Sequence, residues 1–91
     1  MPTYIVESYA TDSAVGDQRV RAARAASVGP GITYIRTTIV PGDQTVLHVF
    51  EAASPEALEG AVEVAALDWD RIVEVVEARA EPAIGGSAPG P

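Results

Sequence analysis

Cysteine is absent from this chain of 91 residues. Its absence excludes disulfide bonds, thiolate metal sites, iron–sulfur clusters and a cysteine nucleophile. Histidine occurs once, as His48, whereas sites for nickel, zinc or copper combine several imidazoles or thiolates. A transition-metal site would need His48 together with carboxylates across a two-fold axis. We therefore expect neither a metal site nor a cofactor.

Basic residues are also few: six stand against thirteen acidic residues, which gives a net charge of −7. Binding to nucleic acid or to anionic membranes depends on a concentrated positive surface, so neither is an expected partner. The apolar runs are far shorter than the ~20 residues of a membrane-spanning helix. The first residues also lack a basic region followed by an apolar core. We expect a soluble, cytoplasmic protein.

The length of the chain predicts one small domain. A domain of this size buries only about 60–65% of the surface that its unfolded chain exposes. Since no disulfide is available, pairing with a second copy would hide more apolar surface. Residues 80–91 are rich in proline and glycine, which predicts a disordered tail. The folded domain is therefore expected to span residues 1–79.

Residues 32–52 predict one long β-hairpin. Its first strand, residues 32–40, is dominated by β-branched and aromatic side chains. The residues of the turn are Pro41, Gly42, Asp43 and Gln44. Proline presets φ there and glycine is free to adopt a positive φ. Residues 45–52 return as the second strand.

One strand and one helix are predicted before this hairpin. The strand covers residues 3–9, and the helix ends near Val28 because Gly29, Pro30 and Gly31 stop it. The candidates for the N-cap of the helix are Thr11, Asp12 and Ser13. Its expected buried stripe contains Val15, Val20, Ala23 and Val28. The stripe is weak, so we expect this helix to pack through small residues.

The second helix has a stronger start signal. Ser54 provides the cap, Pro55 occupies the first helical position and Glu56 places an acid in the first turn. The expected buried face consists of Leu58, Ala61, Val62 and Ala65, at the spacing i, i+3, i+4, i+7. The helix is expected to end at residues 67–70, where Trp69 closes one edge of the core, and residues 71–77 predict the last strand.

The predicted order of elements is β-α-β-β-α-β. With right-handed crossovers, this order gives a ferredoxin-like α+β fold with a four-stranded antiparallel sheet in the order 4-1-3-2. Both helices would cover one face of the sheet. The other face would stay open, and we expect a second subunit or a ligand to cover it.

Alternation along the strands predicts which side chains occupy this open face. The prediction places Glu7, Tyr9, Tyr34, Arg36, His48, Phe50 and Glu74 there. It depends on the hairpin register. A loop of three or five residues puts Arg36 beside His48, whereas a loop of four residues turns one strand over relative to the other. We adopt the register that puts Arg36 and His48 on one face.

These residues could form a site for acid–base chemistry on a small molecule. His48 would transfer the proton, Glu7 or Glu74 would orient it, and Arg36 would bind an anionic group of the substrate. The surrounding ligand-binding residues would be Tyr9, Tyr34 and Phe50. The same residues also fit a dimer interface, in which Arg36 forms a salt bridge with an acid and the aromatic side chains pack.

Four motifs occur together in this chain: MPTYIVE at residues 1–7, YIRT at 34–37, FEAASPEA at 50–57 and DRIVEV at 70–75. In this combination the chain resembles a family of small bacterial proteins of unknown function, some of whose members are labelled nickel-binding protein. The resemblance spans about residues 1–77. It implies a ferredoxin-like α+β fold and commonly a homodimer.

The resemblance does not extend to nickel binding. His48 stands where relatives often carry a cysteine or another residue, and the additional histidines of the nickel-binding members are missing here. Glu7, Arg36 and Glu74 match the family pattern, but the family assigns no catalytic role to them.

Three functional hypotheses follow, in order of preference. The first is a homodimeric module that binds a small molecule or a partner on its open sheet face. The second is a cofactor-free enzyme of the isomerase or cyclase type, in which His48 acts with Glu7. The third is a protein that binds nickel or another transition metal.

Overall fold

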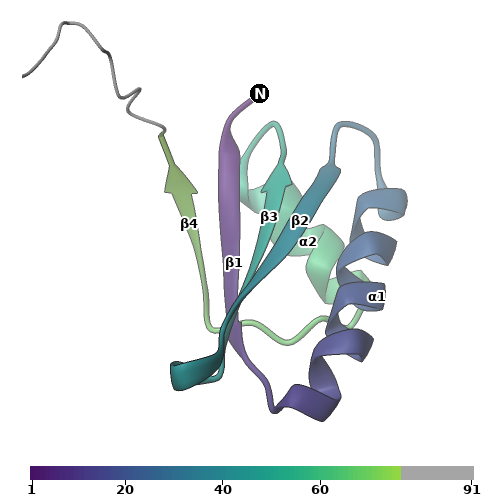
Figure 1. Ribbon diagram of the computed structural model, residues 1–91. Helices are drawn as coiled ribbons and strands as arrows, with labels where there is room; N and C mark the ends of the chain where they lie inside the picture. Colours follow the sequence, from purple (N-terminus) through teal and green to yellow (C-terminus); the bar gives the residue numbers. More distant parts are fainter. Residues whose placement is uncertain (77–91) are drawn as a thin grey trace, which may run out of the picture.

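The computed structural model describes residues 1–76, and this part of the chain contains four strands and two α-helices (Figure 1). The strands are β1 (Thr3–Tyr9), β2 (Thr33–Val40), β3 (Thr45–Glu51) and β4 (Arg71–Val75). The helices are α1 (Asp12–Val28) and α2 (Pro55–Val64). The predicted end of the domain at residue 79 and the predicted tail at 80–91 lie outside the described residues.

The strands of this part form a four-stranded antiparallel sheet in the order β2-β3-β1-β4. Read from the other edge, this is the predicted order 4-1-3-2. Both helices pack on the same face, since one core cluster contains residues of α1, of α2 and of the sheet. The architecture is α+β and is compatible with a ferredoxin-like arrangement.

Helix α2 forms as its sequence predicts. The Ser54 hydroxyl accepts a hydrogen bond of 3.1 Å from the Ala57 N–H, which satisfies one of the free donors at the start of the helix. Pro55 follows at the first helical position. The buried residues of the predicted face are Leu58, Ala61, Val62 and Ala65.

The C-terminal end of α2 forms a Schellman motif without glycine. The Leu67 N–H donates to the Val62 carbonyl at 3.0 Å, and the Ala66 N–H donates to the Glu63 carbonyl at 3.0 Å. This motif requires a left-handed residue, and Ala66 supplies it with φ 59°. Because Ala66 carries a Cβ, the conformation costs about 1 kcal/mol relative to glycine.

Helix α1 buries a different stripe from the one predicted. Val15, Ala22 and Ala25 are buried, whereas Val20 is 56% exposed and Ala23 is exposed. Val28 is also exposed, at 41%. The prediction followed the valines, but the sheet takes the row that contains the small alanines because they allow the helix to approach closely.

The β2–β3 hairpin has a loop of four residues. Val40 and Thr45 are partners at its end, and between them lie a 3₁₀ turn, Pro41–Asp43, and the left-handed residue Gln44 with φ 53°. A β-bulge interrupts the pairing farther along: Tyr34 faces Phe50 and Arg36 faces Val49, which leaves Ile35 without a partner on β3.

Trp69 is half-buried and packs against the main core cluster, as predicted. The core itself lies between the helices and the inner face of the sheet. Its members are Tyr4, Val6, Ala22, Ala25, Phe50, Ala52, Leu58, Ala61, Val62, Ala65 and Leu67.

Candidate functional site

The register of the hairpin separates the two central residues of the predicted site. His48 pairs with Thr37, and Arg36 pairs with Val49. Because neighbouring residues on a strand point to opposite faces, His48 faces the helices and Arg36 faces the open side. The prediction that they share a face is wrong. The reason is the length of the hairpin loop. It has four residues, and with this length the side chains of one strand face the opposite way relative to those of the other.

Strand β4 is also turned over relative to the prediction. Val6 faces the helices, and its partner on β4 is Ile72, so Ile72 faces them too and packs against the core. Glu74 pairs with the buried Tyr4 and lies on the helix side. The predicted inward residues Val73 and Val75 therefore line the open face instead.

The predicted site residues thus divide into two sets. The open face carries Glu7, Tyr9 and Arg36. The helix side carries Tyr34, His48, Phe50 and Glu74. Strand β1 has the predicted orientation, with Val6 inward and Glu7 and Tyr9 on the open face. His48 and Glu7 lie on opposite faces of the sheet.

His48 is fully buried at the centre of a hydrogen-bond network that joins β1, β2, β3 and α1. Its Nδ1 lies 2.8 Å from the Thr37 hydroxyl, which is 2.5 Å from the Tyr34 hydroxyl. Its Nε2 lies 3.1 Å from Oε1 of Gln18. The Ser8 hydroxyl donates to the same Oε1 at 2.9 Å.

The chemistry of these groups sets the direction of each hydrogen bond. Gln18 Oε1 can only accept, so the proton of the neutral imidazole resides on Nε2. His48 Nδ1 then accepts from Thr37, whose single hydroxyl hydrogen is used in this bond. The Tyr34 O–H consequently donates to the Thr37 oxygen. Each side chain of this hydrogen-bond network has a partner.

Burial lowers the pKa of His48 from 6.5 to about 4. The imidazole is therefore neutral at pH 7, and a base with such a pKa accepts protons weakly. Within residues 1–76, no side chain of the open face reaches it, because it lies on the helix side of the sheet at 0% exposure. The role that the geometry supports for His48 is to join two strands to α1.

Gln18 is the residue of this network that the sequence reasoning missed. It lies on α1 in the buried row formed by Val15, Ala22 and Ala25, at the spacing i, i+3, i+7, i+10. A polar side chain within an apolar row indicates a buried partner. The signal was hidden because the prediction assigned the stripe to Val20 and Ala23.

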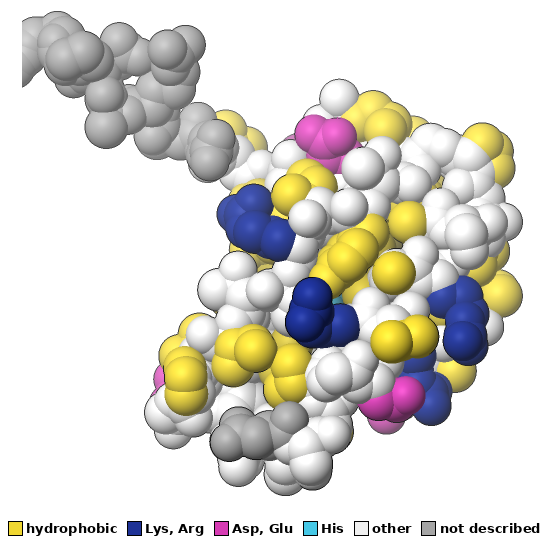
Figure 2. Space-filling model, turned by 45° about the vertical axis from the view of Figure 1, so that its right-hand side comes forward, with side chains coloured by type: hydrophobic (Ala, Val, Ile, Leu, Met, Phe, Trp, Pro, Cys, Tyr) yellow, Lys and Arg dark blue, Asp and Glu magenta, His cyan; other side chains and the backbone are white. Residues whose placement is uncertain are grey.

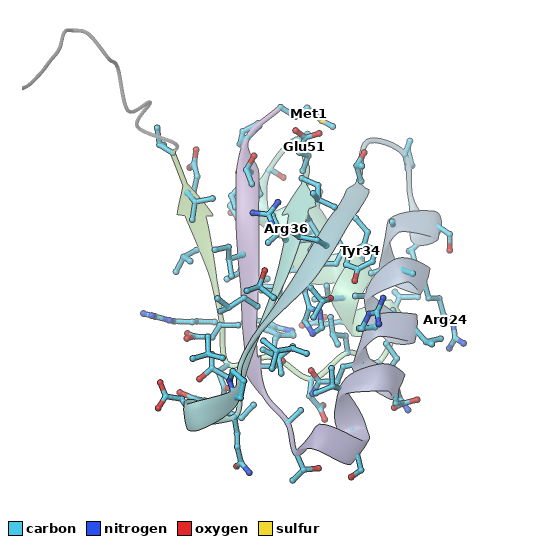
Figure 3. The ribbon with its side chains drawn as sticks, in the orientation of Figure 1. Met1, Arg24, Tyr34, Arg36 and Glu51 are labelled. Carbon is cyan, nitrogen blue, oxygen red and sulfur yellow. The ribbon has the colours of Figure 1, made fainter. Side chains whose placement is uncertain are left out.

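The open face contains a pocket of about 270 Å³. Its apolar walls come from Ile5, Ile35, Val49 and Val75, and its polar groups come from Thr3, Arg36 and Glu51. Figure 3 shows the Arg36 side chain extending from β2 across the sheet toward β1, with Glu51 beyond it near the end of β3. The bulge at Ile35 directs both Ile35 and Arg36 toward this pocket.

Four charged side chains of the described strands belong to the open face: Glu7, Arg36, Glu51 and Arg71. Glu7 and Arg71 pair with each other, and the hydrogen bond to Glu7 raises the pKa of Arg71. Among residues 1–76, neither Arg36 nor Glu51 forms an ion pair. In Figure 2 the basic side chains are scattered among hydrophobic and uncharged ones, and one of them lies beside an acidic side chain.

Within residues 1–76, no group of three or more His, Cys, Asp or Glu side chains is placed to hold a metal ion. In the same range, no helix has the length and apolar character that crossing a membrane requires.

No family model matches the chain, and no curated protein matches it. Its fold is similar to that of the crystal structure of SCO4226 from Streptomyces coelicolor A3(2), with a TM-score of 0.68. The two sequences are 16% identical, and the match covers 85% of this chain and 99% of that chain. At this identity, the likeness concerns the fold.

Proposed function

We propose that the protein is a homodimeric binding module whose open sheet face forms the dimer interface and encloses a small-molecule pocket. The observation that carries this proposal is the apolar character of that face. Its apolar residues are Ile5, Ile35, Leu47, Val49, Val73 and Val75. They come from all four described strands, and both described helices pack on the other side.

Exposure of this face to water is unfavourable. Ile35 is 42% exposed, and Ile5, Leu47, Val73 and Val75 are only half-buried. Contiguous apolar surface rimmed by polar residues is typical of an interaction site. A second copy offers an equally apolar surface of the same shape, so two open faces can bury each other.

The pocket supports the binding of a small molecule within this interface. Four apolar and three polar residues line it, so it offers both kinds of contact, and its volume of about 270 Å³ suits only a small ligand. Within the described part, one side of the pocket is open, and a second copy would close it. The ligand expected there is small and carries both apolar and polar groups.

The enzyme hypothesis that combined His48 with Glu7 has no support in the geometry. The two side chains lie on opposite faces of the sheet, and the His48 nitrogens are occupied by Thr37 and Gln18. The metal hypothesis has no supporting cluster among residues 1–76. The binding module is therefore the function that we put forward.

Native mass spectrometry and light scattering of the untagged protein test the proposal. We expect a dimer, and an additional small mass would identify a bound ligand. Ile35→Glu should give monomers because it places a charge in the interface, whereas Val20→Glu on the outer surface of α1 should leave the dimer intact. The aromatic residues that the sequence placed in this interface, Tyr34 and Phe50, lie on the helix side, so the substitution is made at Ile35 instead. A monomeric wild-type protein would refute the proposal.

A further inference from the structure

The charges of the open face raise a question about the proposed dimer. Glu7 and Arg71 neutralise each other within one chain. Arg36 and Glu51 line the same pocket without forming an ion pair. When a second copy covers the face, both of these charges lose water, and an uncompensated buried charge is strongly unfavourable.

We propose that Arg36 of each subunit pairs with Glu51 of the partner subunit, so that two equivalent ion pairs fix the register of the dimer. This inference rests on the dimer proposed above. It identifies the counter-charges that such a dimer needs: each subunit contributes one cation and one anion, and the interface is neutral at these positions.

The positions of the two residues suit a two-fold arrangement. Arg36 faces Val49, and Glu51 lies two residues farther along β3 on the same face. Their Cβ atoms are therefore diagonal neighbours, about 7–8 Å apart. The Arg36 side chain also extends over the sheet toward β1 (Figure 3). A two-fold axis parallel to the strands, near the middle of the sheet, would lay β3 of the partner subunit over β1. Arg36 extends toward β1, so each guanidinium would approach Glu51 of the partner subunit while the apolar residues of the two faces meet.

The bulge at Ile35 provides a reason for the position of Arg36. The extra residue allows Tyr34 and Thr37 to face the helices while both Ile35 and Arg36 face the open side. Bulges commonly redirect a side chain at a functional surface. Here the bulge places a cation beside the apolar centre of the face.

Charge reversal at each position provides the first test. Arg36→Glu and Glu51→Arg each create two like-charge contacts in the dimer. With about a tenfold effect for each contact, the dimer dissociation constant should rise about a hundredfold in either variant. The matched controls are Arg24→Glu on α1 and Glu59→Arg on α2, which change the net charge equally at exposed positions and should leave the constant unchanged.

A mixture of the two variants provides the decisive test. In a heterodimer of Arg36→Glu with Glu51→Arg, one contact joins two introduced charges of opposite sign and the other joins the two native charges. Native mass spectrometry of the equimolar mixture should therefore show a 1:1 heterodimer, although each variant alone is largely monomeric. The double variant Arg36→Glu/Glu51→Arg should again form a homodimer.

The possible outcomes separate this inference from the proposal beneath it. A monomeric wild-type protein would refute the dimer itself. A wild-type dimer that persists in both single variants would refute only the ion pairs. Restoration in the double variant but not in the mixture would show that Arg36 and Glu51 pair within one chain. If neither the double variant nor the mixture forms dimers, Arg36 and Glu51 do not pair with each other, and each contacts another group, such as an anionic ligand at Arg36. Urea unfolding of each variant, followed by Trp69 fluorescence, checks that it folds.

Discussion

Acidification should destabilise this fold through one side chain, His48. Burial lowers its pKa in the folded protein to about 4, whereas the unfolded chain has the ordinary value of 6.5. Between these two values the unfolded state binds more protons than the folded state. The contribution of neutral His48 to stability is therefore fully present above about pH 6.5 and is lost as the pH falls toward 4.

The magnitude follows from the two pKa values. Their separation corresponds to about 3 kcal/mol over the whole range, of which about 2 kcal/mol is lost between pH 7 and pH 5. Domains of this size have total stabilities of about 5–14 kcal/mol. A loss of 2 kcal/mol is therefore large enough to measure as a shift of the unfolding midpoint.

Two measurements check the expected loss. Urea unfolding at pH 7, 6 and 5, at one protein concentration, can be followed through Trp69, the only tryptophan of the chain. The same series on His48→Gln subtracts the titration of the carboxylates, which both proteins share. NMR titration of the imidazole needs no assignment because the chain has one histidine.

We expect the wild-type protein to lose about 2 kcal/mol more of its free energy of unfolding than His48→Gln between pH 7 and pH 5. Equal losses in the two proteins would contradict it. An imidazole signal that titrates near pH 6.5 in the folded wild-type protein would contradict it as well, and this result stands even if His48→Gln does not fold.

Three further substitutions test local features of the fold by equilibrium unfolding. Ala66→Gly should stabilise the protein by about 1 kcal/mol because glycine adopts the left-handed conformation without strain; a loss of stability would contradict the Schellman assignment. Ser54→Ala should cost about 1 kcal/mol through loss of the helix cap, and no change would mean that the cap is dispensable. In the dissociated subunit, Arg71→Gln should lower the free energy of unfolding by less than about 1 kcal/mol, since the ion pair with Glu7 is exposed to solvent there on the arginine side. A larger loss at a protein concentration too low for dimers would contradict this.

The order of elements and the sheet topology could be predicted from the sequence because they depend on local signals. Ser54 and Pro55 begin α2, the residues 29–31 end α1, and the two β-branched runs on either side of Pro41 form the hairpin. Each of these signals acts within a few residues and does not depend on what the segment packs against.

The faces of the strands could not be predicted with the same success. Alternation gives two sets of side chains on each strand, but the choice between the sets depends on loop length and pairing. The loop after Val40 has four residues, and the bulge at Ile35 changes the alternation again within β2. On β4, valines and isoleucine occupy both faces, so composition alone does not orient it.

The buried network was missed for a related reason. Its members Ser8, Gln18, Thr37 and His48 are common surface residues, and they lie on four different elements. Only the tertiary arrangement brings them together. The polar position Gln18 within the row of α1 alanines was the one local sign of it.

The bulge at Ile35 has a consequence for how this strand can change in length. The residues of β2 directly before and after Ile35 pair with consecutive residues of β3, so Ile35 is the one extra residue of β2. Deletion of Ile35 would therefore make the ladder regular while every other side chain of the hairpin kept its face. In most strands the loss of a single residue exchanges core and surface. Here one position in the middle of a strand is free of that constraint, and a shortened chain would keep its core while losing an apolar contact on the open face.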